Sequence, residues 1–187
     1  MDMTSQQTLP VPKSVAWEAL NDFTLLQAAI PGCEGIHPVP DKPDHYEAVV
    51  LAAVGPVKAK FKGKLQLQEI VPPEGYKLVF EGQGGAAGHA KGHAEIRLEA
   101  NGPHETLLHY TAHATVGGKI AQLGSRLVDM AAQKMAHEFF ERFTAALSER
   151  HAPPIEEPAA VAPAQAQVEP QGLLARVLRW LKGLFGG

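Results

Sequence analysis

The sequence predicts an α+β domain in which a curved antiparallel sheet wraps around a long C-terminal helix. From Glu34 to Val116 the apolar residues recur largely at every second position, which is the period of a strand with one buried face. From Gly118 to Arg150 they recur at intervals of three to five, so one face of a helix stays apolar for about eight turns. A helix of about 30 residues is roughly 45 Å long and needs a large apolar partner surface. The preceding strands supply that surface.

The chain opens with a predicted strand, Met3–Val11, which two short helices follow. Pro12 suits the first turn of the first helix, because its φ is already helical and no N–H is needed there. Asp22 is a suitable N-cap for the second helix, residues 23–30, and Pro31 ends it. We therefore expect the order strand, helix, helix before the pattern of alternation begins.

About six strands follow, and turns separate them. The clearest runs from Val57 to Val71, where lysines and glutamines alternate with alanine, phenylalanine, glycine and leucine. One face of this strand is therefore expected to be solvent-exposed and the other buried. Asn101-Gly102 is a strong hairpin signal between the last two strands. The other predicted strands are His45–Val54, Tyr76–Gly82, His89–Ala100 and Thr106–Val116.

Small residues dominate the inward-facing positions of these strands. Because a close-packed core must fill its volume, such a sheet either meets the helix closely or leaves a cavity. Both interpretations stay open: glycines that bend closely packed strands, or an apolar ligand pocket between sheet and helix. Tyr110 or Phe61 offers a ring that either stacks on a ligand or belongs to the core. The predicted pocket lining is Ala48, Val50, Ala52, Phe61, Leu65, Leu78, Phe80, Ala94, Ile96, Tyr110, Ala112, Leu123, Leu127 and Met130.

Several segments together resemble a known family. They are VAWEALND at residues 15–22, IPGCE at 30–34, GKIAQLGSRL from Gly118, and EFF at 138–140. In this combination the chain resembles the family of the carbon monoxide dehydrogenase G subunit, within the START-like (helix-grip, SRPBCC) superfamily, over roughly residues 1–149. The order of the predicted elements agrees with that superfamily, whose members bind hydrophobic ligands between sheet and helix.

The resemblance implies a function for the whole protein. Its partner would be an aerobic carbon monoxide dehydrogenase or a related molybdenum hydroxylase, to which the protein is a non-catalytic accessory. The ligand would be a hydrophobic small molecule, above all a respiratory quinone such as menaquinone or ubiquinone, held without a covalent bond. The family is also implicated in tethering the enzyme to the cytoplasmic membrane, which would help electrons reach the membrane chain.

The composition changes after Arg150. Residues 151–172 contain no Lys or Arg and several prolines, which predicts a flexible linker after the START-like domain of residues 1–150. Residues 173–187 then form a predicted amphipathic helix, too short to cross a bilayer, that binds a membrane surface or instead docks on a partner or on its own domain. Its apolar arc is Leu173, Leu174, Val177, Leu178, Trp180, Leu181, Leu184 and Phe185, and its polar arc holds Arg176, Arg179 and Lys182.

Composition and charge argue against several classes of protein. A net charge of −3 with no basic stripe on the strands gives no reason to expect nucleic acid as a partner. The single Cys33 cannot form an intramolecular disulfide and fits a reducing compartment. The N-terminus has no basic segment followed by an apolar run, so no secretory signal is expected. We expect a cytoplasmic protein that lies peripherally on the inner face of the cytoplasmic membrane.

The sequence offers little support for catalysis. Four of the nine histidines, His89, His93, His109 and His113, lie at outward positions of two paired strands, where solvated side chains are more plausible than a metal site. No nucleophile elbow and no phosphate-binding loop is present. We therefore predict a protein without catalytic or metal-binding residues. Two alternatives stay open: an enzyme of the polyketide cyclase or hydrolase type acting on a small hydrophobic substrate in the same cavity, or a maturation chaperone of the hydroxylase without a lipid ligand.

Overall fold

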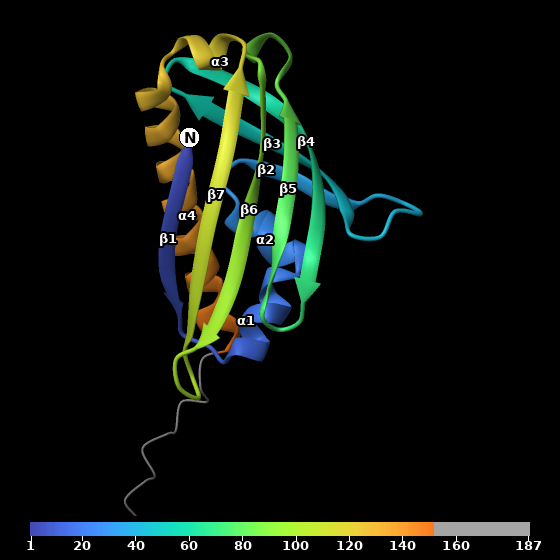
Figure 1. Ribbon diagram of the computed structural model, residues 1–187, viewed down its shortest axis with the longest axis vertical. Coiled ribbons are helices and arrows are strands. Elements are labelled where there is room, and N and C mark those ends of the chain that lie inside the picture. The colour runs from blue at the N-terminus through green and yellow to red at the C-terminus, as the bar shows by residue number, and fades with distance from the viewer. Residues whose placement is uncertain (152–187) are drawn as a thin grey trace, which may run out of the picture. The chain divides into compact units, whose positions relative to one another are not determined.

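The structure is a computed structural model that describes residues 1–151. One antiparallel sheet of seven strands, in the order β1-β7-β6-β5-β4-β3-β2, curves around helix α4 (Figure 1). This arrangement confirms the predicted α+β fold. The strands are β1 (Asp2–Leu9), β2 (Cys33–Pro38), β3 (His45–Val54), β4 (Val57–Val71), β5 (Gly75–Gln83), β6 (His89–Ala100) and β7 (Thr106–Gly117). The helices are α1 (Lys13–Leu20), α2 (Phe23–Ala29), α3 (Lys119–Gln122) and α4 (Ser125–Arg150), and a 3₁₀ turn, η1 (Gly85–Ala87), precedes β6.

The predicted linker (151–172), apart from its first residue, and the predicted terminal helix (173–187) lie outside the described residues. Within residues 1–151, no helix is both long enough and apolar enough to span a membrane.

The helix at the end of the domain is interrupted, so the prediction of one continuous helix from Gly118 to Arg150 is wrong at one place. Gly124 has a φ of +89° and separates α3 from α4. Glycine adopts this non-helical conformation without a steric penalty. Because α4 begins at Ser125 and does not continue the helical repeat of α3, its buried residues are not those predicted by counting from Ile120. Val128 faces the interior, whereas Leu127 and Met130 are 40% and 58% exposed.

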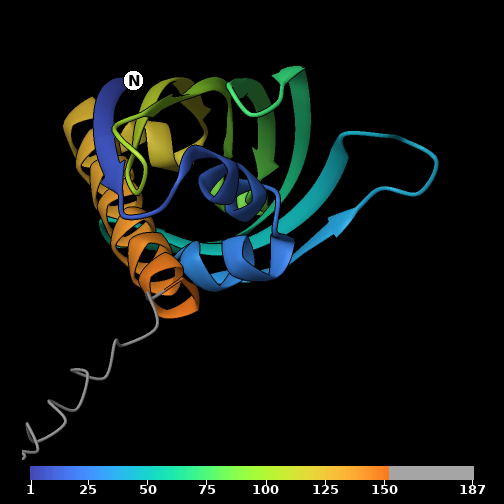
Figure 2. The same cartoon turned by 90° about the horizontal axis from the view of Figure 1, so that it is seen from below.

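Helices α1 and α2 lie within the curve of the sheet, beside the C-terminal part of α4 (Figure 2). As predicted, Asp22 caps α2: its Oδ1 accepts hydrogen bonds from the backbone N–H groups of Thr24 (2.9 Å) and Leu25 (3.1 Å). Its Oδ2 lies 2.6 Å from Nη1 of Arg150, at the end of α4. The cap of α2 is thereby fixed to the last residue of the long helix.

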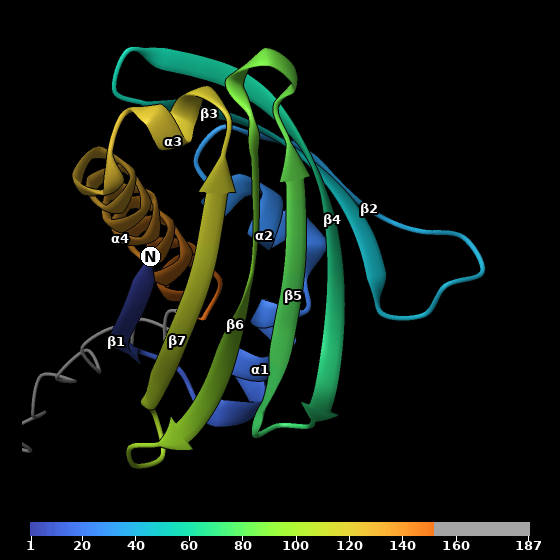
Figure 3. The same cartoon turned by 45° about the horizontal axis from the view of Figure 1, so that its top comes forward.

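The apolar core is concentrated where α1 and α2 cover the sheet. Leu9, Leu98, Leu108, Phe143 and Leu147 are almost completely buried there. Beyond these helices the concave face is covered less completely, and inward-facing side chains of β3, β4 and β6 are only half-buried. Figure 3 shows the sheet between its two edge strands, β1 next to α4 and β2 on the far side.

Two glycines lie close to aromatic rings of neighbouring strands. A Cβ atom at Gly84, between β5 and η1, would lie 2.5 Å from the ring of Phe61. A Cβ atom at Gly92 on β6 would lie 2.0 Å from the backbone oxygen of His113 and 2.9 Å from the ring of Phe80. At Gly92, close packing, one of the two interpretations left open by the sequence, therefore applies.

Candidate ligand cavity

An apolar cavity of about 280 Å³ lies between the sheet, helices α1 and α2, and the C-terminal half of α4. Six strands and three helices contribute to its wall, so its shape depends on contacts between segments that are far apart in sequence. Ligand sites in proteins are typically concave and mostly apolar in this way. Its lining residues are Leu20, Asn21, Phe23, Leu26, Ile30, Ile36, Tyr46, Leu65, Leu67, Tyr76, Leu78, Ile96, Leu108, Phe139 and Phe140.

The polar groups of the cavity are few and uncharged. No Lys, Arg, His, Asp or Glu of residues 1–151 lines it, and its polar side chains belong to Asn21, Tyr46 and Tyr76. The Asn21 amide donates a hydrogen bond of 2.8 Å to the backbone oxygen of Trp17. The hydroxyls of the two tyrosines are therefore the main polar groups left to interact with a ligand.

The two tyrosine hydroxyls stay protonated well above neutral pH. Burial, with a smaller contribution from a charge on Tyr46, raises the pKa of Tyr76 to about 12. Burial also raises the pKa of Tyr46. No hydrogen bond contributes to either shift. At physiological pH both groups are neutral phenols with an O–H to donate.

The rings of both tyrosines are held by aromatic neighbours from the two short helices. Phe23 packs on Tyr46 with a centroid distance of 4.5 Å, and Trp17 meets Tyr76 edge-on at 5.9 Å. Such offset and edge-to-face contacts fix ring orientation in addition to burying area. Residues of α1 and α2 thus position the polar groups that β3 and β5 carry.

The structure places the predicted pocket residues at several different locations. Leu65, Leu78 and Ile96 line the cavity. Tyr110 lies next to it, because its ring stacks on Phe140 with a centroid distance of 5.1 Å. The other residues of the predicted set line other parts of the domain: Ala48 is buried, Val50, Ala52, Phe61, Phe80, Ala94, Ala112 and Leu123 are half-buried, and Leu127 and Met130 are exposed.

The sequence predicted neither the part of the cavity wall that α1 and α2 contribute nor the two tyrosines. The predicted pocket was based on small inward-facing residues, whereas the observed cavity is lined by large side chains. One signal was available for Tyr76, since it alternates in phase with Leu78 and Phe80 and must share their inward face.

A second hollow of about 620 Å³ adjoins the cavity on the outer surface near α2 and β2. Phe23, Ile30 and Ile36 line both spaces, so these three apolar side chains form the partition between the cavity and the surface. Arg142 and Cys33 lie on the outer side of this partition. Burial raises the pKa of the Cys33 thiol, which makes it a poor nucleophile at neutral pH.

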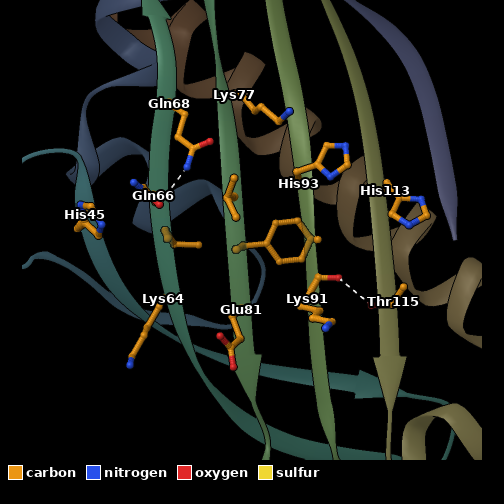
Figure 4. A pocket seen from close by; sticks show the side chains of 14 residues that line it. His45, Lys64, Gln66, Gln68, Lys77, Glu81, Lys91, His93, His113 and Thr115 are labelled. Atoms are coloured by element: carbon orange, nitrogen blue, oxygen red, sulfur yellow. Dashed lines mark hydrogen bonds between the residues drawn. The ribbon is translucent and has the colours of Figure 1, made fainter.

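A third hollow, of about 720 Å³, lies on the opposite, outer face of the sheet (Figure 4). Lys64, Lys77 and Lys91 line it together with three histidines and Glu81. A hydrophobic ligand there would have to lie against these charged, solvated side chains as well as against Leu65, Val79 and Phe80. The smaller apolar cavity is therefore the better candidate for a hydrophobic ligand.

The outward histidines form one close pair within this outer hollow. His93 and His113 are directly opposite in the β6–β7 pairing, with ring centroids 5.8 Å apart (Figure 4). Nδ1 of His113 also lies 2.6 Å from Oδ1 of Asp2, and this hydrogen bond lowers the pKa of Asp2. Residues 1–151 contain no group of three or more His, Cys, Asp or Glu side chains with the geometry to hold a metal ion.

A curved antiparallel sheet that grips a C-terminal helix around an apolar cavity defines a START-like domain, and solved structures show the same fold. A START superfamily protein from Mycobacterium smegmatis has a TM-score of 0.60 and 12% identity, over 80% of this chain and 98% of its own. The Zhui aromatase/cyclase from Streptomyces sp. R1128 has a TM-score of 0.60 and 10% identity, over 80% and 94%. At these identities the likeness concerns the fold alone.

Within this class the family is specific. Residues 6–148 match the family model of CoxG, the G subunit of carbon monoxide dehydrogenase, and the chain belongs to that family. A conserved protein from Geobacillus kaustophilus is similar at 28% identity with a TM-score of 0.74, over 80% of this chain and 96% of that one. No curated protein matches the chain.

Proposed function

We propose that this protein is a non-catalytic accessory of an aerobic molybdenum-type carbon monoxide dehydrogenase. It holds a respiratory quinone in the cavity between sheet and helices, and it helps electrons from the enzyme reach the membrane chain. Membership of the CoxG family supports the association with that dehydrogenase. The observation that carries the ligand proposal is the cavity itself, which is apolar and free of charged side chains within the described residues.

The chemistry of the cavity wall favours an uncharged ligand. A carboxylate or phosphate enclosed there would lose its hydration without gaining a cationic partner, which costs several kcal/mol or more. A quinone ring is flat, apolar and uncharged, and it suits a wall that contains four aromatic residues besides Tyr76: Phe23, Tyr46, Phe139 and Phe140.

The size of the cavity sets how much of a ligand it encloses. At about 280 Å³ it lies just below the roughly 300–1,000 Å³ typical of pockets for drug-sized molecules. It therefore takes the headgroup of a quinone and leaves a long isoprenoid tail outside. The half-buried concave face beyond α1 and α2 offers apolar surface for that tail.

The proposed tether to the membrane rests on the sequence of residues 173–187, which lie outside the described residues. Eight apolar residues fall on one arc of a helix, and Arg176, Arg179 and Lys182 fall on the other. Each cation near an anionic lipid surface contributes about 1 kcal/mol, and the apolar arc adds the energy of burial in the interface.

Two experiments test these proposals separately. Native mass spectrometry of the protein from its host's membranes, followed by solvent extraction, should show one quinone per chain; an empty cavity or an unselective mixture of lipids would contradict the quinone proposal. Deletion of residues 173–187 should leave a folded domain and release both it and the dehydrogenase from membranes. If the dehydrogenase stays on the membrane in that strain, the tethering proposal is wrong.

The cavity gives little support to an enzyme of the cyclase or hydrolase type. General acid–base catalysis near neutral pH needs a group with a pKa close to 7. Among residues 1–151, the ionisable side chains lining the cavity are Tyr46 and Tyr76, and burial moves both pKa values further from neutrality.

A further inference from the structure

We infer that the hydroxyls of Tyr46 and Tyr76 recognise the ligand, and that the part of the ligand enclosed by the cavity therefore carries a carbonyl oxygen. This inference rests on the proposed function, because it uses the same cavity. It adds the residues that determine specificity and the chemical group that they select.

The first argument is where the two side chains lie. Tyr46 is on β3 and Tyr76 is on β5, with one strand between them, and both side chains line the cavity. Both residues therefore belong to the wall of one cavity, and Phe23 and Trp17 pack against their rings.

The second argument is that Tyr76 is surrounded by protein and still accessible. Its side chain keeps part of its accessible surface, yet burial strongly raises its pKa. Because Tyr76 lines the apolar cavity and is not fully buried, it is available to whatever fills that cavity.

The third argument is that no hydrogen bond within residues 1–151 holds either hydroxyl. Asn21, the other polar residue of the described cavity wall, donates its amide to Trp17. Neither tyrosine oxygen is a fully buried atom without a partner, so water can reach both hydroxyls when the cavity holds no ligand. A ligand that displaces this water preserves the hydrogen bonds only if it brings an acceptor, and a pure hydrocarbon does not.

The kind of acceptor follows from charge and geometry. A carbonyl oxygen has two lone pairs and accepts hydrogen bonds from phenol donors. A carboxylate also accepts, but its charge has no cationic partner among the described residues of the cavity wall. A neutral carbonyl on an apolar ring system therefore satisfies the two hydroxyls without burying a charge.

The test compares two probes on the full-length chain by isothermal titration calorimetry. One probe is a naphthoquinone with a short prenyl chain, and the other is the naphthalene with the same chain and no oxygen. Tyr46→Phe and Tyr76→Phe should each weaken quinone binding by about tenfold, the worth of one hydrogen bond, and leave naphthalene binding unchanged. Tyr110→Phe is the matched control, since that ring stacks on Phe140 but does not line the cavity, and it should change neither.

The outcomes separate this inference from the proposed function. Equal losses for both probes, or no loss for the quinone, would overturn the inference and leave the cavity as the binding site. A wild-type protein that binds neither probe would overturn both. The infrared carbonyl stretch of the quinone bound to wild-type protein gives a readout that needs no variant. It should fall below its value in an apolar solvent, and an unshifted stretch would contradict the two hydrogen bonds.

Discussion

Asp22 both caps helix α2 and pairs with Arg150 of α4. Its replacement by alanine therefore tests what holds α2, which forms part of the cavity wall, in place. Its carboxylate caps α2 through Thr24 and Leu25 and pairs with Arg150. Loss of an N-cap typically costs about 1 kcal/mol. The ion pair is partly exposed, at 34% and 47% for the two side chains, so it adds only about 0.5 kcal/mol. We expect Asp22→Ala to lower the free energy of unfolding by about 1.5 kcal/mol at pH 7.

Chemical denaturation of three variants separates the two contributions. Asp22→Asn keeps a capping oxygen and loses the charge, so it should cost about 0.5 kcal/mol, as should Arg150→Ala. Glu149→Ala, an exposed neighbour of Arg150 on α4, is the control and should change stability little. Because α2 carries Phe23 and Leu26 of the cavity wall, Asp22→Ala should also speed ligand dissociation. A change in stability below about 0.3 kcal/mol would refute the capping argument.

The pH dependence of this effect has a definite sign. Hydrogen bonds from Arg150 and from the backbone of α2 lower the pKa of Asp22 in the folded state. A lowered folded-state pKa contributes stability above the unfolded-state pKa, about 3.9 for Asp, and this stability is lost as the pH falls through the folded value. The difference between wild type and Asp22→Ala should therefore be constant near neutral pH and shrink below about pH 4. A difference that grew on acidification would contradict this assignment.

Two further substitutions probe the packing of the domain by thermal or chemical denaturation. Phe143→Ala removes a completely buried ring and should cost about 3–5 kcal/mol, whereas Leu51→Ala, at a site 54% exposed, should stay within about 0.5 kcal/mol. Gly92→Ala would place a Cβ 2.0 Å from the backbone oxygen of His113 and should cost about 1–3 kcal/mol or more. Gly63→Ala meets only ordinary contacts at 3.7 Å and should be tolerated; equal effects of the two glycine substitutions would contradict the close approach at Gly92.

Local patterns in the sequence were sufficient for the fold. The alternation around Lys58 to Lys64 predicts β4, and Asp22 predicts the start of α2, because both signals act over a few residues. The break at Gly124 was missed, since a single glycine is tolerated in many helices and its φ of +89° is set by the chain around it.

The site was harder to predict than the fold. Ile96 and Leu78 belong to the wall and were found from their alternation. Tyr46 and Phe23 meet only because α2 packs against the concave face, a contact between distant elements that no local pattern encodes. The sequence also gives no sign of which end of the sheet α1 and α2 cover, and that end holds the cavity.

The partition of three side chains, Phe23, Ile30 and Ile36, has a consequence for kinetics. Rotations of exposed side chains take picoseconds to nanoseconds, whereas local unfolding takes microseconds to seconds. A ligand that passes between these side chains can exchange with the surface while the hydrogen bonds of the sheet stay intact. Phe23 also packs on Tyr46, so its rotation uncovers that ring as it opens the way. The lifetime of the complex is then set by the affinity of the cavity for its ligand. The protein can bind and release the ligand without unfolding any part of its sheet.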